Sequence, residues 1–195
     1  MMCPDYPGGK AVLRQAQDER RGGKIRSDTV LRLSLRPHPA TPCAVLDRIE
    51  VQVQRLGGGG LDLHYFAHGR IRDVVWPEGV AGARADRLWE TTCFEAFVKP
   101  KGRAGYAEFN FAPSGAWQAY SFTGERAGMA EARGLSAPPA RTRMTGQTRV
   151  HHVRLDLAAV PGLVADAEWA LGLSAVIEDV SGAKSYWALH HPLAK

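Results

Sequence analysis

The strictest constraint on this chain is an alternation of apolar and polar residues that is clearest between Leu88 and Phe122. Within 93–98 the even positions are apolar, whereas Glu95 falls on the odd face together with Phe97. Successive side chains of a β-strand point to opposite faces of the sheet. The stretch therefore predicts short strands joined by the turns KPKGRAG and APSGA, each strand with one core face and one face that mixes polar and aromatic groups.

The next predicted strand, 106–111, repeats this pattern with its odd positions apolar. Tyr106, Glu108 and Asn110 therefore share the other face. A hairpin closed at KPKGRA is predicted to place Glu95 directly opposite Glu108. A register shift of two residues would keep both faces and would separate the two carboxylates diagonally.

Two carboxylates on one strand face repel each other, so a compensating group is expected. An arginine, with Arg126 as the candidate, a divalent cation, a shared proton or the hydroxyl groups of a ligand would each compensate. Three interpretations stay open at this point. Glu95 and Glu108 belong to a structural ion-pair network, contact a polar ligand directly, or form an acid/base pair of the glycosidase type.

Further alternating segments lie on both sides of this stretch and are separated by turns rich in Gly and Pro. Many short strands without a long helix predict an all-β fold, namely an antiparallel β-sandwich of the jelly-roll kind. Residues 1–28 have no sustained period and are predicted to form a disordered N-terminal segment, which leaves 29–195 as the folded domain. The other predicted elements are strands at 31–36, 48–56, 61–68, 70–76, 116–122, 148–157, 168–178 and 184–190, a helical turn at 158–164 and an unpatterned loop at 123–147.

Tryptophans are the candidate platforms for a planar ligand, although a place in the core is the alternative for each of them. Trp117 lies on the odd face of 116–122, and the even face carries aromatic residues as well. An aromatic side chain is therefore presented on whichever face points away from the core. Trp89 and Trp187 stand at strand or loop ends, where binding groups of β-sandwiches tend to lie. One face of 168–178 carries small residues, which either form the floor of a groove or are covered by large aromatic side chains from neighbouring strands: Ala170, Gly172 and Ser174.

Charge and cysteine content argue against several classes of protein. The 25 Lys and Arg exceed the 20 Asp and Glu to give a net charge of +5, and part of this excess lies in the N-terminal segment, unlike the basic stripe of a nucleic-acid-binding face. Three cysteines without CxxC spacing argue against a disulfide framework and a cysteine zinc site, and Cys93 is expected to be a buried thiol. Without a secretory signal or the ~18 apolar residues of a membrane span, a cytoplasmic location is expected.

The histidines do not predict a metal site. His64 and His68 share one strand face but are four residues apart, which is about 13 Å along a strand and too far for one ion. His151 and His152 point to opposite faces. The chain contains no HExxH or related spacing.

The segments LWETTCFEAFVKP, YAEFNFAPSGAWQAYSF, GLSAVIED and SYWALHHP resemble the bacterial DOMON-like proteins, which are related to DOMON domains and to family nine carbohydrate-binding modules. The resemblance covers about residues 30–192. It implies a jelly-roll-like β-sandwich with a ligand site on a concave sheet face or at its rim. Sugar-binding relatives stack tryptophans on the sugar and use carboxylates and amides as hydrogen-bond partners. The resemblance therefore implies such roles for Trp89, Glu95, Asn110, Trp117 and Trp187.

The chain departs from the family pattern in three respects. The pattern usually continues past His-His-Pro, whereas this chain stops at Lys195, so a last strand or rim element is expected to be missing. Family nine modules are secreted parts of larger enzymes, and neither an export signal nor an enzyme domain is evident in this sequence. Heme-binding DOMON domains supply axial Met and His ligands, but Met129 and Met144 fall in or beside the unpatterned loop, which makes heme the secondary interpretation.

The sequence thus predicts a non-catalytic module that binds a carbohydrate or a similar small polar ligand, without a cofactor and without nucleic acid or membrane as partner. The alternatives are a domain that binds heme or another redox cofactor, a glycoside-active enzyme, and a domain that docks on a protein partner through its sheet face. The predicted ligand-binding residues are Trp89, Glu95, Glu108, Asn110, Trp117 and Trp187, with Arg126 as the supporting counter-ion.

Overall fold

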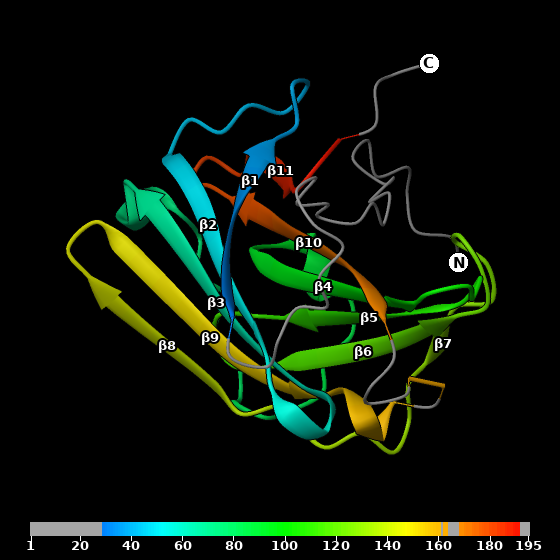
Figure 1. The fold of residues 1–195 in the computed structure, drawn as a ribbon. Coiled ribbons are helices and arrows are strands. Elements are labelled where there is room, and N and C mark those ends of the chain that lie inside the picture. Colours follow the sequence, from blue (N-terminus) through cyan, green and yellow to red (C-terminus); the bar gives the residue numbers. More distant parts are fainter. Residues whose placement is uncertain (1–28, 161, 164–167, 192–195) are drawn as a thin grey trace.

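The computed structural model describes residues 29–160, 162–163 and 168–191. Within them, eleven antiparallel strands form one curled sheet in the order β7-β6-β5-β4-β10-β11-β1-β2-β3-β9-β8 (Figure 1), which confirms the predicted all-β, sandwich-like fold. Its strands are β1 (Val30–Pro37), β2 (Leu46–Arg55), β3 (Gly60–Gly69), β4 (Cys93–Pro100), β5 (Tyr106–Phe111), β6 (Trp117–Phe122), β7 (Ala130–Glu131), β8 (Ala140–Thr145), β9 (Thr148–Asp156), β10 (Trp169–Glu178) and β11 (Lys184–Ala188). Short 3-10 turns connect them: η1 (Gly57–Gly59), η2 (Ile71–Asp73), η3 (Leu88–Glu90) and η4 (Leu157–Ala159).

Strand β1 joins the two halves of this sheet. Its residues from Val30 to Leu35 pair with β2, and the following Arg36 and Pro37 pair with β11. The sheet can therefore curl over at β1 into two layers that face each other (Figure 1). We call β1, β2, β3, β9 and β8 the first layer, and β11, β10, β4, β5, β6 and β7 the second layer.

The hydrophobic core lies between the two layers. Phe94, Phe109 and Phe111 fill it from the second layer, and each is at most 2% exposed. From the first layer, Tyr65 packs its ring 4.9 Å from that of Phe94 and donates a hydrogen bond of 2.8 Å to the carbonyl oxygen of Glu95. The inward faces of the alternating strands thus bury their apolar side chains against each other, which is the main favourable contribution to folding.

The hairpin of β4 and β5 has a different register from the one predicted. Glu95 pairs with Asn110, and Glu108 pairs with Phe97, so the predicted pairing of Glu95 with Glu108 is wrong by two residues. The faces are unchanged because the side-chain period is two. The observed register separates the two carboxyl groups diagonally, and it makes the connecting turn at Gly102 two residues longer than predicted.

Residues 123–147 are more ordered than the predicted unpatterned loop. They contain the short strand β7, which pairs with β6, and the strand β8, which pairs with β9. Both lie at an edge of the sheet, and their side chains are mostly exposed. An edge strand that buries little apolar surface carries no alternating apolar signal, which is why the sequence did not reveal them.

Two other predicted elements differ in type. The strand predicted at 70–76 is the 3-10 turn η2 followed by one isolated bridge from Val74 to Asp179. The apolar residues that suggested a strand, Ile71 and Val74, are buried in the core although the segment forms a turn. The helical turn predicted at 158–164 lies partly outside the described residues, and the described part forms η4, where the carboxylate of Asp156 accepts a hydrogen bond from the Ala158 amide at 3.0 Å.

The predicted disordered segment 1–28 and the chain end at 192–195 lie outside the described residues. Among the residues that are described, no helix has the length and apolar character needed to cross a membrane.

Candidate functional site

The outward face of the second layer carries the acidic and amide residues that the sequence singled out. Glu95, Glu108 and Asn110 all belong to this face, as the alternation predicted, because Phe94 and Phe109 between them fill the core. Cross-strand pairing places four polar side chains, each at most 7% exposed, in one row across β6, β5, β4 and β10. We call them the polar row: Gln118, Asn110, Glu95 and Ser174.

Glu95 lies in the middle of the polar row and is 6% exposed. The hydroxyl group of Ser174 donates a hydrogen bond to its carboxyl oxygen Oε2. Burial, followed by the charge of nearby Glu108, raises the pKa of Glu95 to about 8. Glu95 is therefore mostly protonated at neutral pH, and it can both donate and accept hydrogen bonds without carrying a charge.

Glu108 lies in the neighbouring row, diagonal to Glu95, and is more exposed. The side-chain amide of Asn110 donates to its Oε1 at 2.9 Å. Burial raises the pKa of Glu108, and this hydrogen bond partly counteracts the increase. The repulsion expected between the two carboxylates is thus relieved by their diagonal separation and by the protonation of Glu95.

Arg126 was predicted as the counter-ion of the two glutamates. It lies in the turn after β6 with a φ of 55°, and its backbone amide hydrogen-bonds the hydroxyl oxygen of Tyr106. A paired arginine would lower the pKa of a carboxyl group, whereas the pKa values of Glu95 and Glu108 are both raised. The counter-ion role stays a prediction, and these shifts argue against it.

Three half-buried aromatic side chains lie beside Glu108 on the same outward face, and we call them the aromatic patch. Tyr106 and Phe122 pair across β5 and β6, with ring centroids 4.5 Å apart and nearly parallel planes. Phe97 on β4 lies 6.3 Å from the ring of Tyr106. The alternation placed Phe97 and Tyr106 on this face but left open whether Phe122 points outward, and the predicted platforms were tryptophans instead.

Two of these predicted platforms are core residues. Trp117 is 3% exposed, and its indole Nε1 donates to the carbonyl oxygen of Gly82 at 3.1 Å. Trp187 is 2% exposed and donates to the hydroxyl oxygen of Ser185 at 3.1 Å. Both side chains point into the core between the two layers, so neither can stack on a ligand.

Trp89 is the predicted tryptophan that remains accessible. It belongs to η3, which packs on β4 and β5, and its ring meets Tyr120 of β6 edge to face at 5.7 Å. Tyr120 in turn donates a hydrogen bond to the carboxylate of Asp86. The segment 82–92 therefore contacts the outward face of the second layer at Gln118 of the polar row and at Tyr120, which pairs with Glu108 in the strand register.

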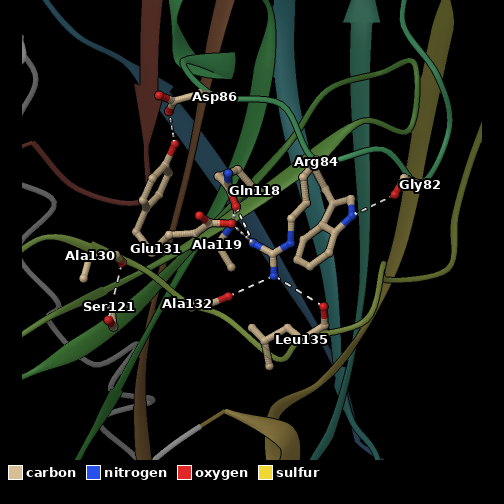
Figure 2. Close-up of polar contacts among 12 residues, drawn as sticks. Gly82, Arg84, Asp86, Gln118, Ala119, Ser121, Ala130, Glu131, Ala132 and Leu135 are labelled. Carbon is tan, nitrogen blue, oxygen red and sulfur yellow. Dashed lines mark hydrogen bonds and ion pairs between the residues drawn. The ribbon is translucent and has the colours of Figure 1, made fainter.

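Arg84 holds this segment in place (Figure 2). Its guanidinium donates to the side chains of Gln118 at 2.5 Å and Glu131 at 3.1 Å, and to the carbonyl oxygens of Ala132 at 2.9 Å and Leu135 at 3.3 Å. It also lies 4.2 Å above the ring of Trp117. One side chain thus connects segment 82–92 to β6, β7 and the residues after β7, and it fixes the orientation of the Gln118 amide in the polar row.

The arrangement suits an uncharged, hydroxyl-bearing ligand. Half-buried Glu108 and the aromatic patch supply hydrogen-bond acceptors and flat apolar faces, and the polar row supplies pre-oriented groups in an adjacent row of the same face. Gly172 pairs with Phe97 in the register, so this position of β10 carries no side chain, and the groove floor stays a prediction.

A group of potential metal ligands, Asp62, His64 and His152, lies on the outward face of the first layer. The sequence missed it because His152 follows His64 by many residues and comes into contact only through the pairing of β3 with β9.

Two antiparallel layers around one apolar core, with a polar and aromatic outward face, define a β-sandwich with a candidate ligand-binding face. No family model matches the chain, and no curated protein matches its sequence. Among solved structures, the fold is similar to that of a "putative carbohydrate-binding protein" from Bacteroides uniformis, with a TM-score of 0.62, over 85% of this chain and 80% of that chain. The two sequences are 14% identical, so this likeness concerns the fold alone. The resemblance to DOMON-like proteins stays a prediction.

Proposed function

We propose that this protein is a non-catalytic binding module for a carbohydrate or a similar small, uncharged polar ligand, held on the outward face of the second layer. The observation that carries the proposal is the aromatic patch of Phe97, Tyr106 and Phe122 beside Glu108. Sugar rings have apolar faces that stack on aromatic rings and hydroxyl groups that pair with carboxyl and amide groups at their edges.

The protonation of Glu95 is consistent with a ligand that carries no charge. A buried carboxyl group with a pKa near 8 adds no negative charge at neutral pH, so it would not attract a cationic ligand. Its protonated oxygen and the Ser174 hydroxyl instead form a neutral hydrogen-bonding pair beneath the face. The description of the structurally similar Bacteroides uniformis protein agrees with a sugar ligand, although fold similarity does not by itself transfer a function.

Calorimetric titration with a panel of neutral mono- and oligosaccharides tests this proposal. We expect at least one sugar to bind, and we expect Tyr106→Ala or Phe122→Ala to weaken its binding about tenfold through the lost stacking area. Phe66→Ala is the matched control, because Phe66 is a half-buried aromatic residue on the outward face of the other layer. Absence of binding to every sugar, or equal effects of the control and the two test variants, would reject the proposal.

A glycoside-active enzyme is the second candidate, and the raised pKa of Glu95 is the observation that favours it. Glycosidases keep one carboxylic acid protonated as the general acid and place a second carboxylate nearby. Burial of Glu95 against Ser174 limits its access to a glycosidic oxygen. Release of reducing sugar from oligosaccharides, abolished by both Glu95→Gln and Glu108→Gln, would favour this candidate over the binding module.

A further inference from the structure

The outward face of the first layer brings three metal-ligand side chains together at the middle of its sheet. Asp62 and His64 are two residues apart on β3, so they project from the same face. His152 on β9 pairs directly with His64 across the strands. Strand register, fixed by the hydrogen-bond ladder and by the core on the opposite face, therefore places one carboxylate and two imidazoles side by side.

The distances within this group are short. His64 Nε2 lies 3.1 Å from Asp62 Oδ2, and His152 Nε2 lies 2.8 Å from Asp62 Oδ1. The two imidazole rings are stacked, with centroids 4.0 Å apart and planes 16° apart. One ligand atom from each of the three residues lies within 4.8 Å of the other two.

These distances match what a small divalent ion requires. A tetrahedral Zn²⁺ with nitrogen and oxygen ligands at about 2.0–2.1 Å places neighbouring ligand atoms roughly 3.3 Å apart. Three protein ligands leave one coordination position open, as in catalytic zinc sites. A shallow hollow lined by Val30, Gln52 and Gln54 adjoins Asp62 and His64, so the group can be reached from solvent. The side chains of His64 and His152 are 34% and 30% exposed.

We propose that Asp62, His64 and His152 form a binding site for one divalent transition-metal ion of the zinc class. The aspartate supplies an anionic oxygen, and each imidazole supplies its Nε2 lone pair while it carries its proton on Nδ1. The ion replaces the hydrogen bonds that the two imidazoles now make to Asp62. This donor set of two nitrogens and one oxygen favours Zn²⁺, Co²⁺ or Ni²⁺ over Mg²⁺ and Ca²⁺, which prefer oxygen ligands only.

A substitution of Arg154 distinguishes a metal site from a purely structural ion-pair network. It pairs with Asp62 in the strand register, and its Nε lies 3.3 Å from Asp62 Oδ1, although its side chain is 57% exposed. In a metal site this cation competes with the ion, so Arg154→Gln is expected to tighten metal binding several-fold. In a structural network without metal affinity, the same substitution would change only the stability of the protein.

Titration of the full-length, tag-free chain with Co²⁺, read by visible absorption and followed by displacement with Zn²⁺, tests the proposal. We expect one ion per chain, and we expect His64→Gln and His152→Gln each to weaken binding by more than about tenfold. The matched controls are His68→Gln, on the same strand face but outside the group, and His38→Gln, beside His191 at the other histidine pair. Circular dichroism checks that each variant is folded.

Three outcomes would overturn the metal site. Either the wild-type chain gives no Co²⁺ spectrum and no Zn²⁺ binding at millimolar metal, or binding persists unchanged in folded His64→Gln and His152→Gln. Loss of binding in His38→Gln instead would assign the ion to the other histidine pair and would also reject the proposal.

Discussion

Glu95 and His151 are two buried titratable residues whose pKa values burial shifts in opposite directions. Burial raises the pKa of Glu95 to about 8 and lowers the pKa of His151 to about 3. In both cases the low-polarity surroundings disfavour the charged form. Since the pKa values move in opposite directions, the two residues oppose stability at opposite ends of the pH scale.

Glu95→Gln is expected to increase stability at high pH. The unfolded Glu95 has a pKa near 4.5 and the folded one near 8, so its contribution is complete below pH 4.5 and is lost as pH rises towards 8. Glutamine cannot ionise, and its carbonyl oxygen can still accept from Ser174. Denaturation at pH 4 and pH 8 should show a gain of about 3 kcal/mol at pH 8 and little change at pH 4. Glu78→Gln, an exposed carboxyl, is the control, and equal shifts at both pH values would contradict the prediction.

His151→Asn is expected to flatten the acid limb of the stability profile. The folded pKa of His151 near 3 lies below the unfolded value of 6.5, so its contribution is complete above pH 6.5 and falls as the pH is lowered towards 3. Asparagine keeps a polar group for Thr142, whose hydroxyl lies 2.8 Å from Nδ1 of His151, but cannot titrate. The variant should be about 1–2 kcal/mol less stable at pH 7 and should lose less stability than the wild type between pH 7 and pH 4.5. A profile parallel to that of the wild type, or the same flattening in the exposed His190→Asn, would refute it.

At the scale of elements, segment 82–92 is held to the second layer by a small number of contacts. Trp117 exchanges backbone hydrogen bonds with Ala83 and Ala85, and the side chain of Arg84 reaches β6 and β7 (Figure 2). This segment and β7 together cover part of the free edge of β6, which would otherwise present unpaired backbone groups. The orientation of Trp89 over Tyr120 depends on this attachment.

Arg84→Gln is expected to loosen this attachment without unfolding the sandwich. Loss of the guanidinium removes hydrogen bonds to two side chains and two backbone carbonyls, and we expect a destabilisation of about 2 kcal/mol. Hydrogen exchange should accelerate in 83–92 and 130–135 and stay unchanged in β2 and β3. Arg87→Gln is the control, because Arg87 lies in the same segment and its side chain forms an ion pair with Glu90, three residues further along the chain. Unchanged exchange in Arg84→Gln would show that the backbone contacts suffice.

At the scale of the whole molecule, β1 makes the two layers one cooperative unit. It pairs with both β2 and β11, and Leu35, which is 4% exposed, lies where the strand passes from one layer to the other. Core contacts such as Tyr65 with Phe94 add further coupling between the layers. The layers are therefore expected to unfold together.

Leu35→Ala tests this coupling. Truncation of a buried leucine should lower the free energy of unfolding by about 3 kcal/mol and leave the denaturant dependence unchanged. Tryptophan fluorescence, which includes the buried Trp117 and Trp187 of the second layer, should then report the same midpoint as far-UV circular dichroism, which reports both layers. Separate midpoints for the two probes would show that the layers unfold independently.

The sequence by itself determined which residues share a strand face. Alternation is a local property of the chain, so Glu95, Glu108 and Asn110 could be assigned to the face opposite Phe94 and Phe109 without knowledge of any neighbour. The same argument correctly placed His64 and His68 together and separated His151 from His152. It could not decide which face of 116–122 points inward, because both faces carry aromatic residues.

Only the tertiary structure decided how these strands meet. The β4–β5 register differs by two residues from the predicted one, and Trp117 points into the core. His152 lies beside Asp62 and His64, which are distant from it in the sequence. Register, strand order and inward direction depend on packing between segments distant in the chain. They are set by the total burial of the two layers against each other, which no local pattern contains.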